Sequence, residues 1–247
     1  MNQREIFEQD GFVSVTGFIT DSELFQIETT IERFIEERVS ALPPEHVFYE
    51  DKTNLTTLKQ IQRLHEYDEF FKSFFNDKPR RLAEKLLGES VDGRNVDYFT
   101  KPPPLSQATP PHQVGFYFMF EPCHALTMWM ALDMVDEDNG CVRYVRGSHK
   151  NGMRPHGRTQ TLGFSQGITD FGKGSDQLEE VACTARPGDL LAHHALTIHR
   201  AEANSSATRN RLSLVFIFYA KCAHENVVAH KAYQSKLAAE MADAGKI

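Results

Sequence analysis

The pattern of apolar and polar positions changes near residue 91 of this 247-residue chain. Before that point most apolar residues recur at intervals of three or four, which places them on one face of a helix. After it they gather in short runs that glycine and proline separate, as strands and their turns do. The chain is therefore predicted to be mainly β, with helices that flank a strand-rich core.

The first part of the chain carries clear signals for helix ends. Thr20 and Glu23 have the spacing of a capping box ahead of an apolar stripe that continues to about Val39. Pro79 lies in the first turn expected for another helix, which Gly88 ends. In chain order, the elements expected before residue 91 are a strand at residues 10–15, a helix at 20–39, an irregular stretch at 43–60 with an extended piece at 46–49, and helices at 69–75 and 77–88.

Short apolar runs follow, at the spacing typical of jelly-roll strands. They are residues 96–100, 115–120, 126–134, 141–145, 189–192 and 212–219. The stretch 152–175 is rich in small polar residues and is predicted to be a long loop over the mouth of the barrel, where such loops are usually functional. The tail at residues 225–246 is predicted to form a surface helix.

The length fits one domain with a sizeable core, because 40% of the 247 residues are hydrophobic. We expect a single domain over residues 1–247, without internal repeats or a low-complexity linker. In it residues 1–90 form the N-terminal helical flank, residues 91–222 form the double-stranded β-helix (jelly-roll, cupin-like) core, and residues 223–247 form a C-terminal helix.

Composition removes several classes of function. The net charge of -7 and the pI near 5.9 argue against a nucleic-acid-binding surface, since such surfaces concentrate Lys and Arg. No run approaches the roughly 18 apolar residues of a membrane span. The cysteines have no CxxC spacing and follow no signal peptide, so we expect reduced core thiols in a cytoplasmic protein. These residues are Cys123, Cys141, Cys183 and Cys222.

Two histidines far apart in the sequence are the candidate metal ligands. His112 starts an apolar, aromatic run, and His199 ends the strand that the turn Pro187–Gly188–Asp189 starts. Histidines at the ends of two strands suit the two-histidine, one-carboxylate iron site of a double-stranded β-helix. Strand alternation predicts that Val114 lies beside His112 on the same face, where the carboxylate is expected.

Several short motifs occur in a specific order between residues 95 and 222. They are Lys101–Pro102–Pro103, Pro111–His112–Gln113, Thr127–Asp133, Asp138–Cys141, Arg146–Lys150, Pro187–Gly188–Asp189 and His199. In this order and spacing they resemble the phytanoyl-CoA dioxygenase family of Fe(II)/2-oxoglutarate enzymes. The resemblance implies a jelly-roll core, Fe(II) held by two histidines and a carboxylate, and 2-oxoglutarate as co-substrate.

The distal carboxylate of 2-oxoglutarate needs a cation inside the barrel, and arginine binds it best through paired hydrogen bonds. The stretch Arg209–Ser213 matches the family pattern at the start of a strand, so we expect Arg209 to bind the co-substrate, with Arg211 as the second choice. Trp129 resembles the family tryptophan near the co-substrate, and Lys101 is a further candidate for that pocket. The alternatives are surface charges for the arginines, a core aromatic for Trp129 and a solvated side chain for Lys101.

Three further histidines are weighed as pocket residues. His149 and His156 flank the predicted loop, where each is either a substrate contact or a polar loop residue. His194 resembles a family histidine near the pocket. It lies five positions before His199, so alternation turns it away from the metal unless a bulge intervenes.

The chain departs from the family motif His-x-Asp, because it reads His112–Gln113–Val114. Valine cannot bind a metal, and loss of the carboxylate is expected to lower metal affinity by at least the roughly 10 to 100-fold that even outer-shell changes cause. Gln113 is expected to face the other side of the strand unless a bulge turns it inward. Glu121 and Glu202 lie an odd number of residues from the nearer histidine, so neither is an obvious replacement.

Three functions remain open at this stage. An oxygenase would convert 2-oxoglutarate and O2 to succinate and CO2 while it hydroxylates a small organic substrate, and the resemblance favours it. In related halogenases Gly or Ala replaces the aspartate so that chloride binds there, although Val114 is bulkier than either. A non-catalytic binding protein would keep the barrel and pocket without redox chemistry. The loop at residues 152–175 is expected to select the substrate, and neither the substrate nor the oligomeric state follows from the sequence.

Overall fold

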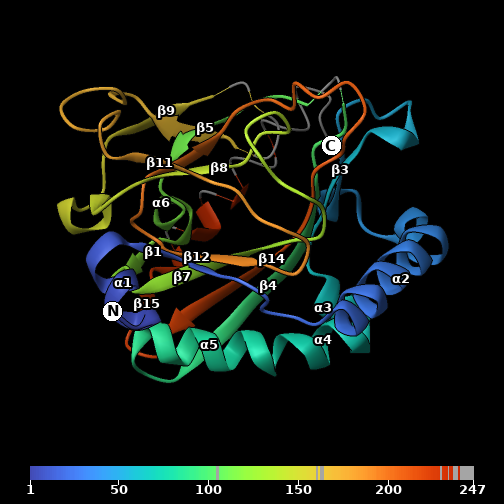
Figure 1. Ribbon diagram of the computed structural model, residues 1–247, viewed down its shortest axis with the longest axis horizontal. Helices are drawn as coiled ribbons and strands as arrows, with labels where there is room; N and C mark the ends of the chain where they lie inside the picture. Colours follow the sequence, from blue (N-terminus) through green and yellow to red (C-terminus); the bar gives the residue numbers. More distant parts are fainter. Residues whose placement is uncertain are drawn as a thin grey trace.

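The computed structural model describes residues 1–103, 106–159, 161, 164–228, 230–232, 234, 235 and 239. Two antiparallel sheets face each other in it, and helices cover the outer face of the larger sheet (Figure 1). The larger sheet has the order β1-β12-β7-β14-β4-β3-β2, and the smaller one has the order β11-β8-β13-β5. This arrangement confirms the mainly β, jelly-roll architecture with flanking helices.

In the order of the larger sheet, its strands are β1 (Phe12–Val15), β12 (Leu190–His194), β7 (Ala125–Ala131), β14 (Leu212–Ala220), β4 (Val91–Thr100), β3 (Leu58–Ile61) and β2 (Val47–Tyr49). The smaller sheet contains β11 (Glu180–Cys183), β8 (Val142–Val145), β13 (His199–Ala201) and β5 (Thr109–His112). Two further strand pairs are β9 (His156–Arg158) with β10 (Gln166–Ile168), and β6 (Phe120–Glu121) with β15 (His224–Glu225).

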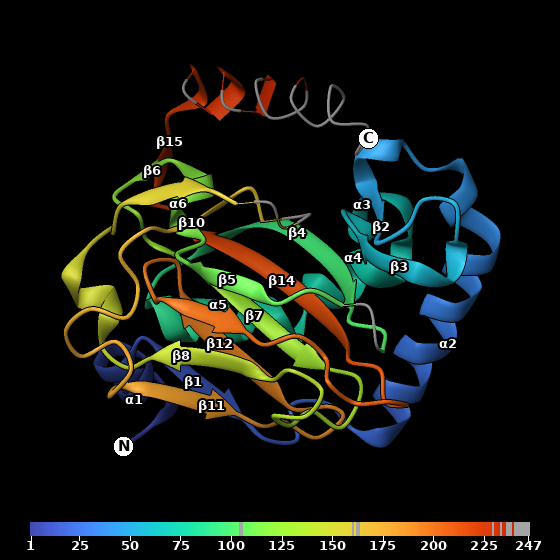
Figure 2. The same ribbon diagram turned by 90° about the horizontal axis from the view of Figure 1, so that it is seen from above.

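The α-helices are α1 (Gln3–Asp10), α2 (Asp21–Arg38), α3 (Leu64–Tyr67), α4 (Glu69–Phe75), α5 (Lys78–Leu87) and α6 (Gly115–Phe118). Short 3-10 turns occur at Val39–Ala41, Pro44–His46, Leu55–Thr57 and Ser148–Asn151. Figure 2 shows α2 at one side of the sheets and α1 at the opposite side.

The central strands of the larger sheet are apolar on both faces, which is why they read as continuous apolar runs rather than alternating ones. On β7, Met128 and Met130 pack with the helices in one buried cluster. Trp129 belongs to the second buried cluster, between the sheets, with Leu191 and Val215 from the neighbouring strands. Trp129, Leu191 and Val215 therefore mark the inner face of the larger sheet, which faces the smaller sheet.

The helix-end signals in the sequence are confirmed. The backbone N–H of Thr20 donates to the Glu23 carboxylate at 2.8 Å, and the Glu23 N–H donates back to Thr20 Oγ1 at 3.3 Å. α5 begins with Pro79 in its first turn and ends at Gly88, whose φ of 78° is accessible to glycine at little cost. Each expected helix before residue 91 is present, and α1 and α3 are additional.

The strand predicted at residues 115–120 is wrong. The chain leaves β5 at His112 and turns into α6, which a local apolar and aromatic run does not reveal. The Gly115 N–H donates to the Ala195 carbonyl at 2.9 Å, and a β-carbon at Gly115 would lie 2.5 Å from Cys123 Sγ. Contacts with a distant part of the chain thus hold this turn, and they require glycine.

Two other expectations need correction. The predicted loop at residues 152–175 contains the β9–β10 hairpin, which contacts β5.

The four cysteines are free, as expected, but Cys222 is exposed rather than in the core, and its thiol donates to Glu89 Oε1 at 3.0 Å. Of the helix predicted for residues 225–246, Glu225 belongs to β15 instead, and the described residues between 227 and 239 are helical, as predicted. The remaining part of this prediction lies outside the described residues. The division of the single domain into flank, core and tail stays a prediction.

Among the described residues, no helix has both the length and the apolar character that crossing a bilayer requires.

A buried carboxyl group should make stability depend on pH. Asp97 is 4% exposed on β4 and accepts a hydrogen bond from the Arg63 N–H at 3.0 Å. Burial raises the pKa of Asp97 from 3.8 to about 7, so ionisation of the folded protein is penalised. This penalty is absent at pH values below the pKa that Asp97 has in the unfolded chain. It grows as the pH rises toward the pKa that Asp97 has in the folded protein.

We therefore expect the Asp97→Asn variant, which keeps the acceptor oxygen, to be more stable than the wild type at about pH 8. Its free energy of unfolding should be larger by on the order of a few kcal/mol. The advantage should shrink toward about pH 5, where the folded wild type carries the proton. Urea unfolding at the two pH values measures it. An equal difference at both pH values would contradict the assignment.

Candidate active site

The smaller sheet brings the two predicted metal ligands together. His112 ends β5 and pairs with His199 of β13, whose other neighbour across the sheet is Tyr144 of β8. The rings of His112 and His199 have centroids 4.1 Å apart, and the two residues are 4% and 9% exposed. Two histidines separated by 87 positions (199 minus 112) thus lie side by side inside the protein.

Both rings are oriented as metal ligands usually are. His112 Nδ1 lies 2.9 Å from the carbonyl oxygen of Pro110, and His199 Nδ1 lies 2.9 Å from that of Thr197. A carbonyl only accepts, so each Nδ1 carries the hydrogen and each Nε2 keeps its lone pair. Burial lowers the pKa of both histidines well below the usual value, which holds them in the neutral form that binds metals.

A third histidine lies beside this pair, and the sequence analysis missed it. His193 is on the inner face of β12, 3% exposed, with its ring centroid 4.2 Å from that of His199. Its Nδ1 lies 3.1 Å from the Tyr144 hydroxyl, and its Nε2 is buried without a hydrogen-bond partner. Burial lowers the pKa of His193 to about 3. Alternation along β12 was the available signal, because it places His193 on the same face as Leu191 of the interior cluster.

The other histidines considered from the sequence have other partners. His194 points out of the barrel, with its ring 5.6 Å from that of His149. The expected strand that ends at His199 is wrong, because β12 ends at His194 and His199 starts β13 in the other sheet, so alternation does not run from His199 to His194. His149 packs near α1, where its Nε2 lies 3.2 Å from the Glu8 carbonyl. His156 stacks on Phe116 at 4.4 Å and accepts a hydrogen bond from a backbone N–H, so it supports the turn beneath the β9–β10 hairpin.

The residues around the missing carboxylate offer no acidic replacement. Val114 is not on a strand, contrary to expectation: it has φ -61° and ψ -25° at the start of α6 and packs against the interior cluster. The Gln113 amide is fully engaged, since it donates to the carbonyls of Gly152 and Leu196 and accepts from the Arg154 N–H. The side chain therefore ties the hairpin region to the turn after β12.

The two glutamates considered as substitutes are also occupied elsewhere or exposed. Glu202 pairs with Arg200, and Glu121 is exposed on β6. Within the described ranges, no three His, Cys, Asp or Glu side chains are already gathered around one point as a metal site.

The two arginines lie in different environments, and these favour Arg211, our second choice, over Arg209 as the candidate for the co-substrate. Arg209 is at the surface, where its guanidinium forms paired hydrogen bonds with Asp136 at 2.7 and 2.8 Å. Arg211 is 5% exposed, lies 5.3 Å from the Trp129 ring and donates to the Gly140 carbonyl at 2.6 Å. The residues before β14 form an irregular segment, so alternation does not extend from position 211 to position 209.

Arg211 has the properties that a carboxylate partner needs. Burial lowers the pKa of Arg211 to about 10, which still leaves it charged at neutral pH. Its Nε has no hydrogen-bond partner, and the same is true of Ser213 Oγ and Thr127 Oγ1, all of them buried. Ser213 follows Arg211 by two positions on the inner face of β14, and Thr127 pairs with His193 across the sheet. Unsatisfied buried donors on one face indicate a site for a polar ligand.

Lys101 is buried rather than solvated, so the alternative considered for it is wrong. Its Nζ donates to the carbonyls of Glu202 at 2.6 Å and Gln107 at 3.0 Å, and its N–H donates to the Arg211 carbonyl. Burial lowers the pKa of Lys101 to about 6. These bonds connect the segment after β4 to the segment after β13, and a role for Lys101 in co-substrate binding stays a prediction.

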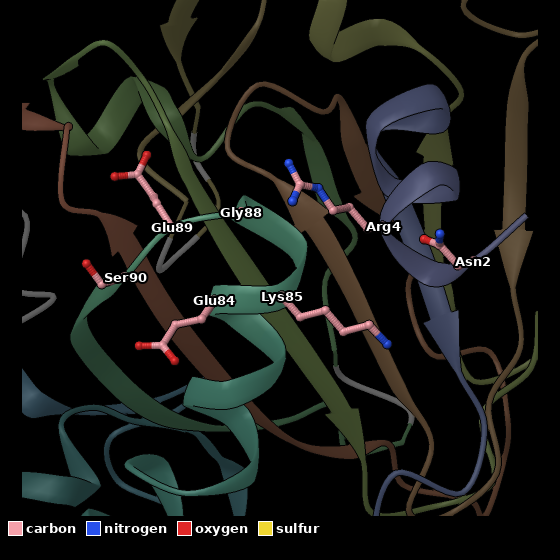
Figure 3. A pocket seen from close by; sticks show the side chains of 7 residues that line it. All are labelled: Asn2, Arg4, Glu84, Lys85, Gly88, Glu89 and Ser90. Atoms are coloured by element: carbon pink, nitrogen blue, oxygen red, sulfur yellow. The ribbon is translucent and has the colours of Figure 1, made fainter.

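A surface hollow of about 680 Å³ lies elsewhere, between α1 and α5 (Figure 3). Arg4, Glu84 and Lys85 are among its lining residues. Arg4 pairs with Glu8, and Lys85 donates to Gln3 Oε1 at 2.9 Å, so these cations already have partners on α1. The hollow therefore lacks the unsatisfied buried donors of the barrel interior.

A family model described as phytanoyl-CoA dioxygenase (PhyH) matches residues 7–212. Among curated proteins, the peroxisomal phytanoyl-CoA dioxygenase of Mus musculus is 25% identical over 222 residues, covering 83% of this chain and 64% of that protein. The phytanoyl-CoA dioxygenase of Arabidopsis thaliana is 29% identical over 206 residues, covering 79% and 68%. The chain thus spans about 64% of the length of the mammalian relatives that it matches.

Two solved structures show the same fold. The epimerase SnoN, in complex with Fe3+, alpha ketoglutarate and nogalamycin RO, superposes with a TM-score of 0.73 at 23% identity, covering 90% of this chain and 84% of that one. EctD from S. alaskensis, with 2-oxoglutarate and 5-hydroxyectoine, has a TM-score of 0.73 at 17% identity, covering 88% and 75%. At these sequence identities the similarity establishes the fold only. The chemistry has to be inferred from the residues of the site.

Proposed function

Because the chain belongs to the phytanoyl-CoA dioxygenase family, as its motifs indicated, we propose that it is an Fe(II)- and 2-oxoglutarate-dependent oxygenase of a small organic substrate. The observation that carries this proposal is that two histidines and a buried arginine share the barrel interior. The Nδ1 atoms of His112 and His199 bond to backbone carbonyls, so the Nε2 lone pairs remain as potential metal ligands, and Arg211 is buried in the same interior with an unsatisfied donor. These are the groups that a metal and a dicarboxylate require.

The residues fit a metal ion without supplying the usual carboxylate. His112 and His199 would hold Fe(II) through Nε2, with their Nδ1 hydrogens fixed on backbone carbonyls. When bound, the metal supplies O2 activation coupled to oxidation of 2-oxoglutarate to succinate and CO2. Phe164 and Tyr117 lie beside the His112 ring, with centroids 5.1 and 6.2 Å away, and exclude water from that side.

The residues fit 2-oxoglutarate equally well. The Arg211 guanidinium binds the distal carboxylate, since a charge-assisted bond is strongest where water is excluded. Ser213 Oγ donates to the same carboxylate from two positions along β14, which satisfies an otherwise unpaired hydroxyl. Trp129 packs against Arg211 and fixes the plane of the guanidinium. The tryptophan thus has a positioning role in addition to its place in the core.

Binding of the two ligands tests the proposal. Anaerobic calorimetry of the purified protein should show Fe(II) binding, followed by 2-oxoglutarate binding at one site per chain. The control ligand is glutarate, which keeps both carboxylates and lacks the keto group, and it should bind more weakly once the metal is present. A folded protein that binds neither Fe(II) nor 2-oxoglutarate would refute the proposal.

Val114 keeps a halogenase as the second candidate, because a missing carboxylate leaves room for a halide. Val114→Asp distinguishes the candidates, since the new carboxylate adds a charge and a ligand beside the histidines. An oxygenase should gain iron affinity, by about tenfold or more, and should form succinate without chloride in both forms. A halogenase should instead lose chloride-dependent turnover, and an inactive binding protein should gain metal but form no succinate. Succinate measured under air, with and without chloride, separates these outcomes.

A further inference from the structure

His193 has an unexplained feature that the proposed function does not use. Its Nε2 is a strongly polar atom that is buried without a partner, although nearly all such atoms in folded proteins have one. An orphaned nitrogen of this kind is costly unless a ligand satisfies it. The same residue lies in the interior, on β12, across from the two histidines of the smaller sheet.

The hydrogen bond at the other ring nitrogen is compatible with a metal-binding tautomer. The Tyr144 hydroxyl lies 3.1 Å from His193 Nδ1, and a hydroxyl both donates and accepts. When Nδ1–H donates to this oxygen, Nε2 has a free lone pair. His112 and His199 reach that state through backbone carbonyls, so all three rings have an oxygen at Nδ1 and differ only in its source.

The spacing of the rings also fits a shared ion. The His199 centroid lies 4.1 Å from that of His112 and 4.2 Å from that of His193. Metal–imidazole bonds of about 2.1 Å place neighbouring ligand rings roughly 4 to 5 Å apart. His199 is thus a close neighbour of both other rings. Because no three such side chains of the described residues are already gathered as a metal site, binding requires the rings to turn toward one point.

We infer that His193 is the third protein ligand of the metal, so that a three-histidine set of His112, His193 and His199 replaces the two-histidine, one-carboxylate set. The inference rests on the proposed function and explains two observations together: the orphaned Nε2 and the valine at position 114. The exchange removes one negative charge from the metal, since a neutral imidazole stands in for a carboxylate. It also moves the third ligand from the turn after β5 to β12.

X-ray absorption of the anaerobic Fe(II)-loaded protein counts imidazole ligands and does not depend on turnover. We expect three imidazoles in the wild type and two in His193→Phe, which keeps a ring against Tyr144 and removes both nitrogens. The dissociation constant for Fe(II), measured by anaerobic titration, should rise at least about 100-fold in His193→Phe. His194→Phe is the matched control, because its ring faces out of the barrel, and it should keep three imidazoles and wild-type affinity.

The outcomes separate this inference from the proposed function. Two imidazoles in the iron-loaded wild type would overturn the role of His193 and leave the oxygenase proposal standing. Equal Fe(II) affinity in the wild type and His193→Phe would overturn it as well. A folded wild type that takes up no Fe(II) would instead refute the proposed function itself. Because the ligand count is made on the wild type, the test holds even where His193→Phe fails to fold.

Discussion

Replacing Arg211 by methionine is expected to abolish 2-oxoglutarate binding at ordinary concentrations while the protein stays folded. The side chain is buried, stacks on Trp129 and has one unsatisfied donor, so its charge has a carboxylate as its natural partner. Truncating one member of a buried hydrogen-bonded charge pair costs on the order of 2 to 5 kcal/mol of binding. Methionine fills the same space against the tryptophan, which limits the loss of packing.

Arg209→Met is the matched control for this variant, because Arg209 belongs to the same segment but pairs with Asp136 at the surface. Calorimetric titration of 2-oxoglutarate into the metal-loaded protein measures both variants. Arg209→Met should bind within about twofold of the wild type, since exposed ion pairs contribute little. A loss of affinity in Arg209→Met with Arg211→Met unaffected would return the role to Arg209.

Loss of either histidine of the β5–β13 pair should remove most of the bound iron. His112→Ala and His199→Ala each remove an Nε2 whose orientation is fixed by a bond from Nδ1 to a backbone carbonyl. Because the site already lacks a carboxylate ligand, loss of one histidine should weaken metal binding strongly. We expect the dissociation constant for Fe(II) to rise at least about 100-fold in each variant. Metal content after anaerobic loading and desalting measures this.

His149→Ala is the control for the histidine variants, since this ring lies near α1, with its Nε2 3.2 Å from the Glu8 carbonyl. It should retain wild-type iron. The site assignment fails where a folded His112→Ala/His199→Ala double variant keeps the full complement of iron.

Strand-level features were readable from the sequence because they depend on local pattern. The apolar runs gave the strands of the β7–β12–β14 region, and the two histidines expected to lie together are paired across β5 and β13, although His199 starts β13 rather than ending β12. The count from His199 to His194 crosses the turn between β12 and β13, so it did not apply. Alternation along β12 alone places His193 on the same face as the interior Leu191, so this residue was missed although its signal was present.

Features that depend on distant contacts were not readable in this way. α6 replaces an expected strand because the Gly115 N–H donates to the carbonyl of the distant Ala195, which no local window contains. The choice between Arg209 and Arg211 depended on where β14 starts, and boundaries are the least reliable part of a prediction from sequence. The irregular segment before that strand leaves Arg209 at the surface and Arg211 inside.

Succinate formation is the most direct measurement of the central claim, because uncoupled turnover of 2-oxoglutarate needs no knowledge of the true substrate. The protein is loaded with Fe(II) without oxygen, given 2-oxoglutarate and then exposed to air, and succinate is quantified against Arg211→Met as the binding-deficient control. The account predicts succinate from the wild type that requires Fe(II), 2-oxoglutarate and O2 together, and none above background from Arg211→Met. A wild type that is folded, iron-loaded and saturated with 2-oxoglutarate, yet forms no succinate, would contradict the oxygenase and leave a binding protein in its place.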